Sequence, residues 1–304
     1  MGPSWSGVIA GALRPGRRCC HLVRNNAAAL KRCKPRAQKL PAGLRTLTLL
    51  SPADPSPVHI LNPAGAAPFL LVCDHFGRAV PHLLGDLGVP APEWDRHIAW
   101  DIGIAGVCRV LSAALDATCI AQAYSRLVID CNRRPGHPTS IPPCSDNTVI
   151  PGNTGLSPAD RAARAAHIFD PYHQAIAAEL DRRRAAGIPA ILIAMHSFTS
   201  VYQGFVRPWH AGILFNRDDR LARPMLDLLS QEPGMVVGEN EPYAVSDATD
   251  YTVPVHCERR HLPHLELEIR QDLIEDEAGQ REWAERLARL LPDALRHMMQ
   301  SEKK

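Results

Sequence analysis

The chain has 304 residues, of which 45% are hydrophobic, so it is long enough for one large α/β domain or two small ones. Its net charge of +2, and the lack of any apolar run near the roughly 20 residues that span a bilayer, argue against nucleic acid and membrane as partners. Nine irregularly spaced cysteines without a CxxC motif predict reduced thiols in a cytoplasmic protein rather than a disulfide framework or a cysteine zinc site.

The beginning of the chain is basic. Residues 1–53 contain no Asp or Glu, and their basic side chains are Arg14, Arg17, Arg18, Arg24, Lys31, Arg32, Lys34, Arg36, Lys39 and Arg45. Three interpretations are open: a disordered tail, an organelle transit peptide, or sequence from a start codon placed too far upstream. We favour a poorly ordered extension without a catalytic role over residues 1–56, followed by a single folded domain over residues 57–304 that begins near Pro57.

The first clear structural signal is the apolar run Phe69–Cys73, which predicts a buried strand of an α/β sheet. It is followed by Asp74 and His75, and Gly77 then permits a tight turn. Open α/β sheets place their ligands at the carboxyl ends of their strands. We therefore expect His75 to belong to a functional site, the alternative being a capping Asp next to a surface His.

The segment from Trp94 to Leu115 has apolar residues at helical spacing, which predicts a helix. Within it His97 and Asp101 are four residues apart and would share one helix face.

Two shorter apolar runs, at residues 118–123 and 127–129, predict a strand pair or one broken strand. The second run leads into Asn132 and Arg133, which again places polar groups at a strand end. Residues 134–155 are rich in Pro, Gly, Ser and Asn and predict a long loop, which in compact domains is often functional.

The remaining elements alternate between helix and strand. Ser157, Pro158 and Asp160 form a helix start, and Gly187 ends that helix after Ala186. We expect a strand at 190–194 that delivers His196, strands at 211–215, 235–237 and 264–269, a helix at 218–229 and a closing helix at 279–299. This alternation predicts a three-layer α/β domain.

Three predicted strands end in His75, Asn132–Arg133 and His196, and a fourth carries Glu268. If these strands adjoin, their polar groups meet at one edge of the sheet. Two His and one carboxylate are a typical ligand set for catalytic zinc. A nearby carboxylate can then move a proton from water to a leaving nitrogen, and an Arg can hold a substrate carboxylate. Such a set suits hydrolysis of an N-acyl amino acid.

The chain from about Pro57 to Leu295, roughly four-fifths of its length, resembles the N-formylglutamate amidohydrolase family, which is related to aspartoacylases and zinc carboxypeptidases. The segments that carry the resemblance are Val72–Gly77 with Pro81, Asp95–Gly103, Ser125–Arg133, Met195–Phe198, Gly238–Tyr243 and Glu268–Ile274. The resemblance implies a zinc-carboxypeptidase-like fold, with a mixed central β-sheet flanked by helices, and one divalent metal ion, Zn²⁺.

The resemblance also assigns roles. His75 and His196 match metal ligands, and Glu268 matches the strand-borne general base, with Glu266 as the alternative. Asn132 and Arg133 match a pair that grips substrate. Arg126 matches a second Arg that would stabilise the oxyanion or the substrate carboxylate, unless it only pairs with Asp130.

The chain departs from the related carboxypeptidase-like sites at the second ligand. Their motif is His-x-x-Glu, but Arg78 stands three residues after His75. The missing carboxylate must come from elsewhere, and we expect Asp101, with Asp95 and Asp74 as alternatives. Asp101 could instead brace a ligating His.

The function that follows is a metal-dependent amidohydrolase that cleaves an N-acyl amino acid such as N-formylglutamate to formate and glutamate, as in histidine degradation. The alternatives are hydrolysis of another N-acyl amino acid or a peptide end, and a non-catalytic metal-containing binding protein of the same fold. We expect a small-molecule substrate as the partner, a cytoplasmic location, and a monomer or small homo-oligomer.

Overall fold

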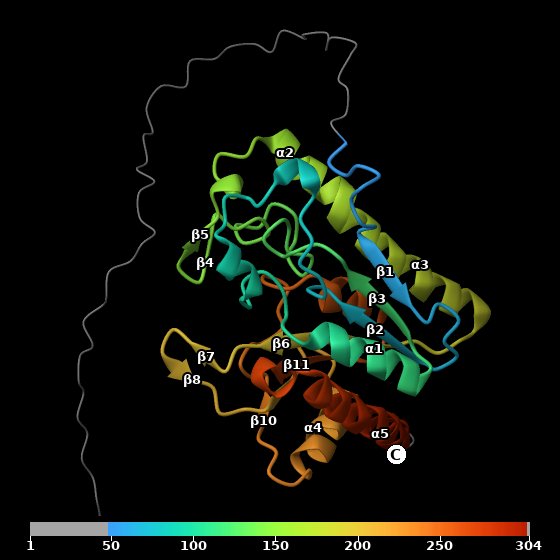
Figure 1. Ribbon diagram of the computed structural model, residues 1–304. Helices are drawn as coiled ribbons and strands as arrows, with labels where there is room; N and C mark the ends of the chain where they lie inside the picture. The colour runs from blue at the N-terminus through green and yellow to red at the C-terminus, as the bar shows by residue number, and fades with distance from the viewer. Residues whose placement is uncertain (1–47, 303–304) are drawn as a thin grey trace, which may run out of the picture. The chain divides into compact units, whose positions relative to one another are not determined.

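The computed structural model describes residues 48–302, which form a three-layer α/β domain around a mixed seven-stranded sheet (Figure 1). The strand order is β1-β3-β2-β6-β11-β9-β10. Their bounds are β1 Val58–Leu61, β2 Phe69–Cys73, β3 Thr118–Gln122, β6 Ile191–Phe198, β9 Ala211–Leu214, β10 Val237–Glu239 and β11 His264–Arg270. Residues 1–47 of the predicted basic extension (residues 1–56) lie outside the described residues. Within the described part of that extension, Leu49 is buried in the core.

Strands β3, β2, β6 and β11 run parallel to one another, whereas β1 is antiparallel to β3 and β9 is antiparallel to β11. The carboxyl ends of β2, β6 and β11 therefore lie at the same edge of the sheet. Two small hairpins lie outside the main sheet: β4 Cys144–Ser145 with β5 Thr148–Val149, and β7 Val201–Tyr202 with β8 Phe205–Val206.

Helices cover both faces of the sheet. They are α1 Ile104–Leu115, α2 Pro158–Arg164, α3 Asp170–Ala186, α4 Ala222–Ser230 and α5 Glu277–Ser301, with short helical turns at His82–Leu84, Ala91–Asp95, Pro151–Asn153, Ala165–Phe169, Val253–Cys257, Glu258–Arg260 and Gln271–Leu273. One core packs α1, α4 and α5 against Leu71, Ile193 and Leu267 of the sheet. The opposite core packs α3 against Leu70 and Leu192, because strand residues alternate between faces.

The helix predicted from Trp94 begins only at Ile104, so His97 and Asp101 do not share a helix face. The cause is Gly103, which has a φ of +78° and packs so closely against the chain that a Cβ there would lie 2.0 Å from the carbonyl oxygen of Ile274. The apolar spacing of residues 94–102 instead belongs to a short turn and a loop. This loop carries Asp101 toward the edge of the sheet.

The strand predicted at residues 127–129 is also wrong. These residues form a buried turn, in which Ser125 accepts a hydrogen bond from the backbone of Leu127 and donates one to the carbonyl of Ala99. The predicted helix start is confirmed: Ser157 and Asp160 form a reciprocal capping box, and Gly187 ends α3 in a left-handed conformation.

Within residues 48–302 the six cysteines are free thiols. No helix in the same range is long and apolar enough to cross a membrane.

Candidate metal and substrate site

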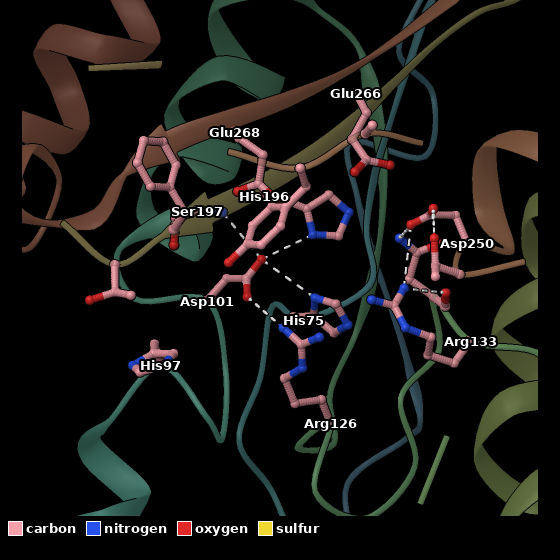
Figure 2. A pocket seen from close by; sticks show the side chains of 16 residues that line it. His75, His97, Asp101, Arg126, Arg133, His196, Ser197, Asp250, Glu266 and Glu268 are labelled. Atoms are coloured by element: carbon pink, nitrogen blue, oxygen red, sulfur yellow. Dashed lines mark hydrogen bonds and ion pairs between the residues drawn. The ribbon is translucent and has the colours of Figure 1, made fainter. Parts of the chain in front are cut away.

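Three neighbouring parallel strands bring the predicted site residues together at one edge of the sheet (Figure 2). His75 lies two residues after the end of β2, and His196 lies two residues before the end of β6. Glu268 of β11 pairs in register with His196. The expectation that these groups converge is therefore met by the strand order, although Asn132 and Arg133 reach the site from a loop and not from a strand end.

A buried His–Asp–His cluster lies at the bottom of this arrangement and could bind a metal ion. One ligand atom from each of His75, Asp101 and His196 lies within 4.8 Å of the other two. Oδ2 of Asp101 is 3.5 Å from Nδ1 of His75 and 3.0 Å from Nδ1 of His196. All three residues are at most 3% exposed, so the cluster is shielded from solvent.

Each histidine of the cluster has a carboxylate on the opposite side of its ring. Nε2 of His75 lies 2.8 Å from Oδ1 of Asp130, and Nε2 of His196 lies 3.3 Å from Oδ2 of Asp74. A carboxylate behind a ligating imidazole fixes the tautomer and the ring orientation. The residues therefore fit a divalent cation: both Nδ1 atoms face Asp101, and Nδ1 of His75 is buried and has no hydrogen-bond partner among the residues that the structure describes.

The electrostatics of the cluster support this assignment of protons. Burial alone would raise the pKa of Asp130, but Arg126 and His75 outweigh it and hold that pKa well below its usual range. Asp130 is thus ionised and can only accept a hydrogen bond, so Nε2 of His75 is the donor. Burial lowers the pKa of His196, yet hydrogen bonding to Asp101 and Asp74 raises it overall.

Asp101 is the carboxylate that the loop brings to the two histidines. Its backbone N–H donates to the carbonyl of His75 at 3.0 Å, and its Oδ2 also accepts from the backbone N–H of Ser197 at 3.2 Å. The two alternatives lie elsewhere. Asp95 forms an exposed ion pair with Arg78, and Asp74 stands behind His196, where it also accepts a hydrogen bond from Thr252.

Two carboxyl groups of β11 face the cavity beside the cluster. Glu266 and Glu268 are 4% and 5% exposed, and within residues 48–302 neither has a hydrogen bond or an ion pair. Burial is the main cause that raises the pKa of both carboxyls. Two buried carboxyls without partners are costly for the fold, which makes this wall of the cavity a candidate place for chemistry or binding.

The two arginines of the site are held differently. Arg126 bridges two buried carboxylates, with Nη2 2.7 Å from Oδ2 of Asp130 and Nη1 3.4 Å from Oδ1 of Asp101. Arg133 makes one looser ion pair, 3.3 Å from Asp250. Both side chains are about a quarter exposed, at 27% and 23%, and both line the cavity, so each can still contact a ligand.

Asn132 lies beside Arg133 but has its side chain engaged by the protein. Its Oδ1 accepts hydrogen bonds from the backbone of Tyr251 and Thr252, and its Nδ2 donates to Asp250. It lines the cavity, yet its contacts suit a residue that positions Asp250 and the 250–252 segment for Arg133.

The cavity has a volume of about 370 Å³ and adjoins a second one of about 350 Å³. They share His97, Arg126, Arg133 and Tyr243 in their walls. His97 therefore lies near the site, although it is not part of the metal cluster.

Several contacts of the site were not expected from the sequence. Asp130 was expected only as a partner of Arg126 and Asp74 only as an alternative ligand, but both lie behind the histidines. Asp250 beside Arg133 and Tyr243 in the wall of both cavities were not expected as site residues. Asp130 had a local signal, since it follows Arg126 by four residues and pairs with it. The partner of Asp250 is more than a hundred residues away in the sequence, so no local pattern could reveal it.

Comparison with known proteins agrees with this fold. The family model for N-formylglutamate amidohydrolases matches residues 67–275. The crystal structure of a gene product from Agrobacterium tumefaciens is 36% identical over 83% of this chain and 99% of its own, with a TM-score of 0.80. An N-formylglutamate amidohydrolase from Ralstonia eutropha, 20% identical over 82% of this chain and 98% of its own, has a similar fold with a TM-score of 0.53. Among curated proteins none matches. The chain belongs to the N-formylglutamate amidohydrolase family.

Proposed function

We propose that this protein is a zinc-dependent amidohydrolase that cleaves an N-formyl amino acid, with N-formylglutamate as the first candidate, to formate and glutamate. Family membership supports the reaction class. The observation that carries the mechanism is Glu268, whose buried carboxyl has no partner in the described part of the chain and which pairs with His196 in the register of β11 and β6. A hydrolase needs an unengaged carboxylate beside its metal ligands, whereas a protein that only binds metal does not.

The metal ligands in this proposal are His75, Asp101 and His196. When bound, a zinc ion would polarise the acyl carbonyl and lower the pKa of a water molecule. Asp130 holds the His75 imidazole with Nδ1 facing the cluster, and Asp74 lies behind the His196 ring, 3.3 Å from its Nε2. A ligand set of two imidazole nitrogens and one carboxylate is typical of zinc, whereas calcium prefers sites made only of oxygen ligands.

Glu268 takes a proton from the attacking water and passes it to the leaving nitrogen. The carbon–nitrogen bond of the amide breaks as the water oxygen bonds to the acyl carbon. One water is consumed, and the products are formate and an amino acid with its ammonium group. Arg126 is held rigidly by Asp101 and Asp130, so it can stabilise negative charge on the acyl oxygen without reorganising.

Arg133 binds the carboxylate of the amino-acid half, and Asn132 holds Asp250 in place behind it. A guanidinium suits a carboxylate because it offers two parallel N–H donors.

The second candidate substrate is an N-acyl amino acid with a larger acyl group or a larger side chain than N-formylglutamate. The adjoining cavity of about 350 Å³ offers space that a formyl group and a glutamate do not need, and it shares Arg126 and Arg133 with the first. We also propose that the protein works in a reducing compartment such as the cytoplasm, because its six cysteines in residues 48–302 are free thiols.

The test measures the release of free L-glutamate by the full-length protein with one equivalent of zinc from N-formyl-L-glutamate and from N-acetyl-L-glutamate, with formate and acetate assayed as the respective second products. We expect formate release that stops after chelation and returns with zinc. Cleavage of the acetyl substrate alone would reject the formyl assignment. No cleavage of either by protein that retains zinc would reject the proposed function.

A further inference from the structure

We propose that Glu266 binds the nitrogen of the amino-acid half of the substrate: the N–H of the scissile amide before cleavage, and the ammonium group of the product afterwards. This inference rests on the proposed function and deepens it, because it names what the site recognises besides the carboxylate and the acyl group.

The strand geometry places Glu266 in the site. Residues two apart on a strand point to the same face, so Glu266 faces the cavity as Glu268 does. In the register of the sheet Glu266 lies between Ala194 of β6 and Leu214 of β9, neither of which has a side chain that can donate a hydrogen bond.

Glu266 has a buried carboxyl group that finds no partner among residues 48–302. It is 4% exposed, and its Oε2 is fully buried without a hydrogen bond. Arg133, which lines the same cavity, is engaged by Asp250 and by the carbonyl of Asn132, and the His196 ring is held by Asp101. Buried carboxyls in folded proteins nearly always have partners, so a partner supplied by a ligand explains this residue best.

The positions of the other groups limit what that partner can be. Figure 2 shows the two carboxyls on different sides of the His196 ring, with Glu268 toward Ser197 and Glu266 toward Asp250 and Arg133. A substrate whose carbonyl lies at the metal cluster and whose carboxylate lies at Arg133 has its nitrogen between them, because that nitrogen is bonded to both the carbonyl carbon and the α-carbon. Glu266 lies on the side of the His196 ring toward Arg133, where this nitrogen would be (Figure 2).

The chemistry of the reaction fits this placement. The amide N–H is a single donor, and after cleavage the same nitrogen becomes a cationic ammonium group with three donors. A carboxylate can accept from the nitrogen in both states. Glu268, on the other side of His196, remains available for the water. Before proton transfer the two carboxyls on this strand then have separate partners, water for Glu268 and the amide N–H for Glu266, and Glu268 afterwards passes its proton to the same nitrogen.

Binding experiments can test this without turnover. We would measure the affinity of the full-length zinc-loaded protein for L-glutamate and for glutarate, which has the same carbon chain and carboxylates but no amino group. The variants are Glu266→Leu, which removes the acceptor, and Glu266→Gln, which keeps the shape and removes the charge. Zinc content and the thermal unfolding midpoint serve as folding controls.

We expect Glu266→Leu to weaken glutamate binding at least tenfold and to leave glutarate binding no weaker than in the wild type. Glu266→Gln is nearly isosteric and should fold. It is expected to weaken glutamate binding by a smaller factor and likewise to leave glutarate binding no weaker. Equal weakening of both ligands would assign Glu266 a purely structural role, and no weakening of either would remove it from the site. A wild type that binds neither ligand would also overturn the proposal.

A kinetic comparison gives a second readout. N-formyl-L-glutamate has an N–H, whereas the O-formyl ester of 2-hydroxyglutarate does not. We expect Glu266→Leu to lower kcat/KM at least tenfold for the amide and less than threefold for the ester. A wild type that binds glutamate but hydrolyses no formyl substrate would reject the proposed function, while the comparison of glutamate with glutarate would still decide the role of Glu266.

Discussion

Nε2 of His75 donates a hydrogen bond to Oδ1 of Asp130 at 2.8 Å, on the side of the ring that faces away from Asp101. The same carboxylate binds Arg126 through its other oxygen, at 2.7 Å. Asp130 therefore orients the imidazole of a proposed metal ligand and an arginine of the cavity at once. Its role depends on charge, because an amide in its place could present its oxygen to only one of the two donors.

We expect Asp130→Asn to weaken zinc binding by about 10- to 100-fold, which is typical for loss of the carboxylate behind a ligating histidine. The physical reason is that the His75 ring loses its fixed tautomer and orientation. The measurement is a competition titration of zinc against a chromophoric chelator.

The matched control for this prediction is Asp95→Asn, the same chemical change in an exposed carboxylate that pairs with Arg78 outside the cluster. Its zinc affinity should equal that of the wild type. Zinc binding by Asp130→Asn within twofold of the wild type would show that Asp130 does not support the ligand.

Glu268→Gln is expected to lower kcat for N-formylglutamate by a factor on the order of 10² to 10⁴ with little change in KM, because the amide cannot accept the proton from water. Zinc content should stay at one equivalent, since Glu268 is not a ligand in this site. Steady-state formate release measures both constants. Glu275→Gln, at an exposed position shortly after β11, serves as the control with wild-type activity; a kcat for Glu268→Gln above a tenth of the wild-type value would exclude it as the general base.

Arg133→Ala should raise KM for N-formylglutamate about 10- to 100-fold, because one charge-assisted hydrogen bond to a carboxylate contributes about 1.5 to 3 kcal/mol. Asp250 keeps hydrogen bonds from the backbone of Ser246 and from Thr249, so the loop should stay folded. The next residue, Arg134, is exposed and outside the cavity wall, and Arg134→Ala is the control. If an α-carboxamide substrate lost as much from Arg133→Ala as the acid does, Arg133 would not be reading the carboxylate.

The convergence of His75, His196 and Glu268 could be predicted from the sequence because it depends on local signals. Each residue belongs to or directly follows an apolar run with strand character, and such strands in α/β folds end at a common edge. Asp101 was expected in the cluster for a wrong reason. It arrives on a loop that begins after the turn at Ala91–Asp95, and not on a helix face.

What the sequence could not show depends on contacts between distant segments. The end of the apolar pattern at Gly103 follows from its packing against Ile274, and the pairing of Asp74 with His196 crosses from β2 to β6. The engagement of the Asn132 amide by residues 250–252 is of the same kind. Residue patterns indicate which face of an element is apolar. They do not indicate which distant backbone group or side chain will form a hydrogen bond or ion pair with a given polar residue.

Gly103→Ala is expected to destabilise the fold by at least about 2 kcal/mol, since a Cβ at φ +78° is strained and would also overlap the carbonyl oxygen of Ile274. Urea unfolding midpoints measure the change. Gly187 provides a matched comparison: its φ is +67°, but no atom of residues 48–302 outside its own neighbours lies within 4 Å of an added Cβ, so Gly187→Ala should cost only about 1 kcal/mol. Equal shifts in the two variants would show that the contact with Ile274 adds nothing to the backbone strain.

The buried pair His173 and His256 should make stability depend on pH. His173 donates from Nε2 to the carbonyl of Cys131 at 2.8 Å, so its Nδ1 accepts from Nε2 of His256 at 2.9 Å. Burial lowers the pKa of His173 to about 4 and that of His256 to about 3, although Asp74 attracts the protonated form of both. The unfolded chain takes up protons below about pH 6.5, whereas the folded chain stays neutral until the lower values.

Above pH 6.5 this pair therefore does not lower the free energy of unfolding. As pH decreases from 6.5 toward 4, the free energy of unfolding falls by up to about 1.4 kcal/mol per pH unit for each histidine. We expect His256→Gln, which keeps a donor for His173, to reduce this slope relative to the wild type. Urea unfolding with chelator present, at half-unit steps from pH 7.5 to 4.5, measures it without a contribution from metal release. His59→Gln, at an exposed position on β1, should retain the wild-type slope. Parallel pH profiles for the wild type and His256→Gln would show that this pair does not set the acid sensitivity of the fold.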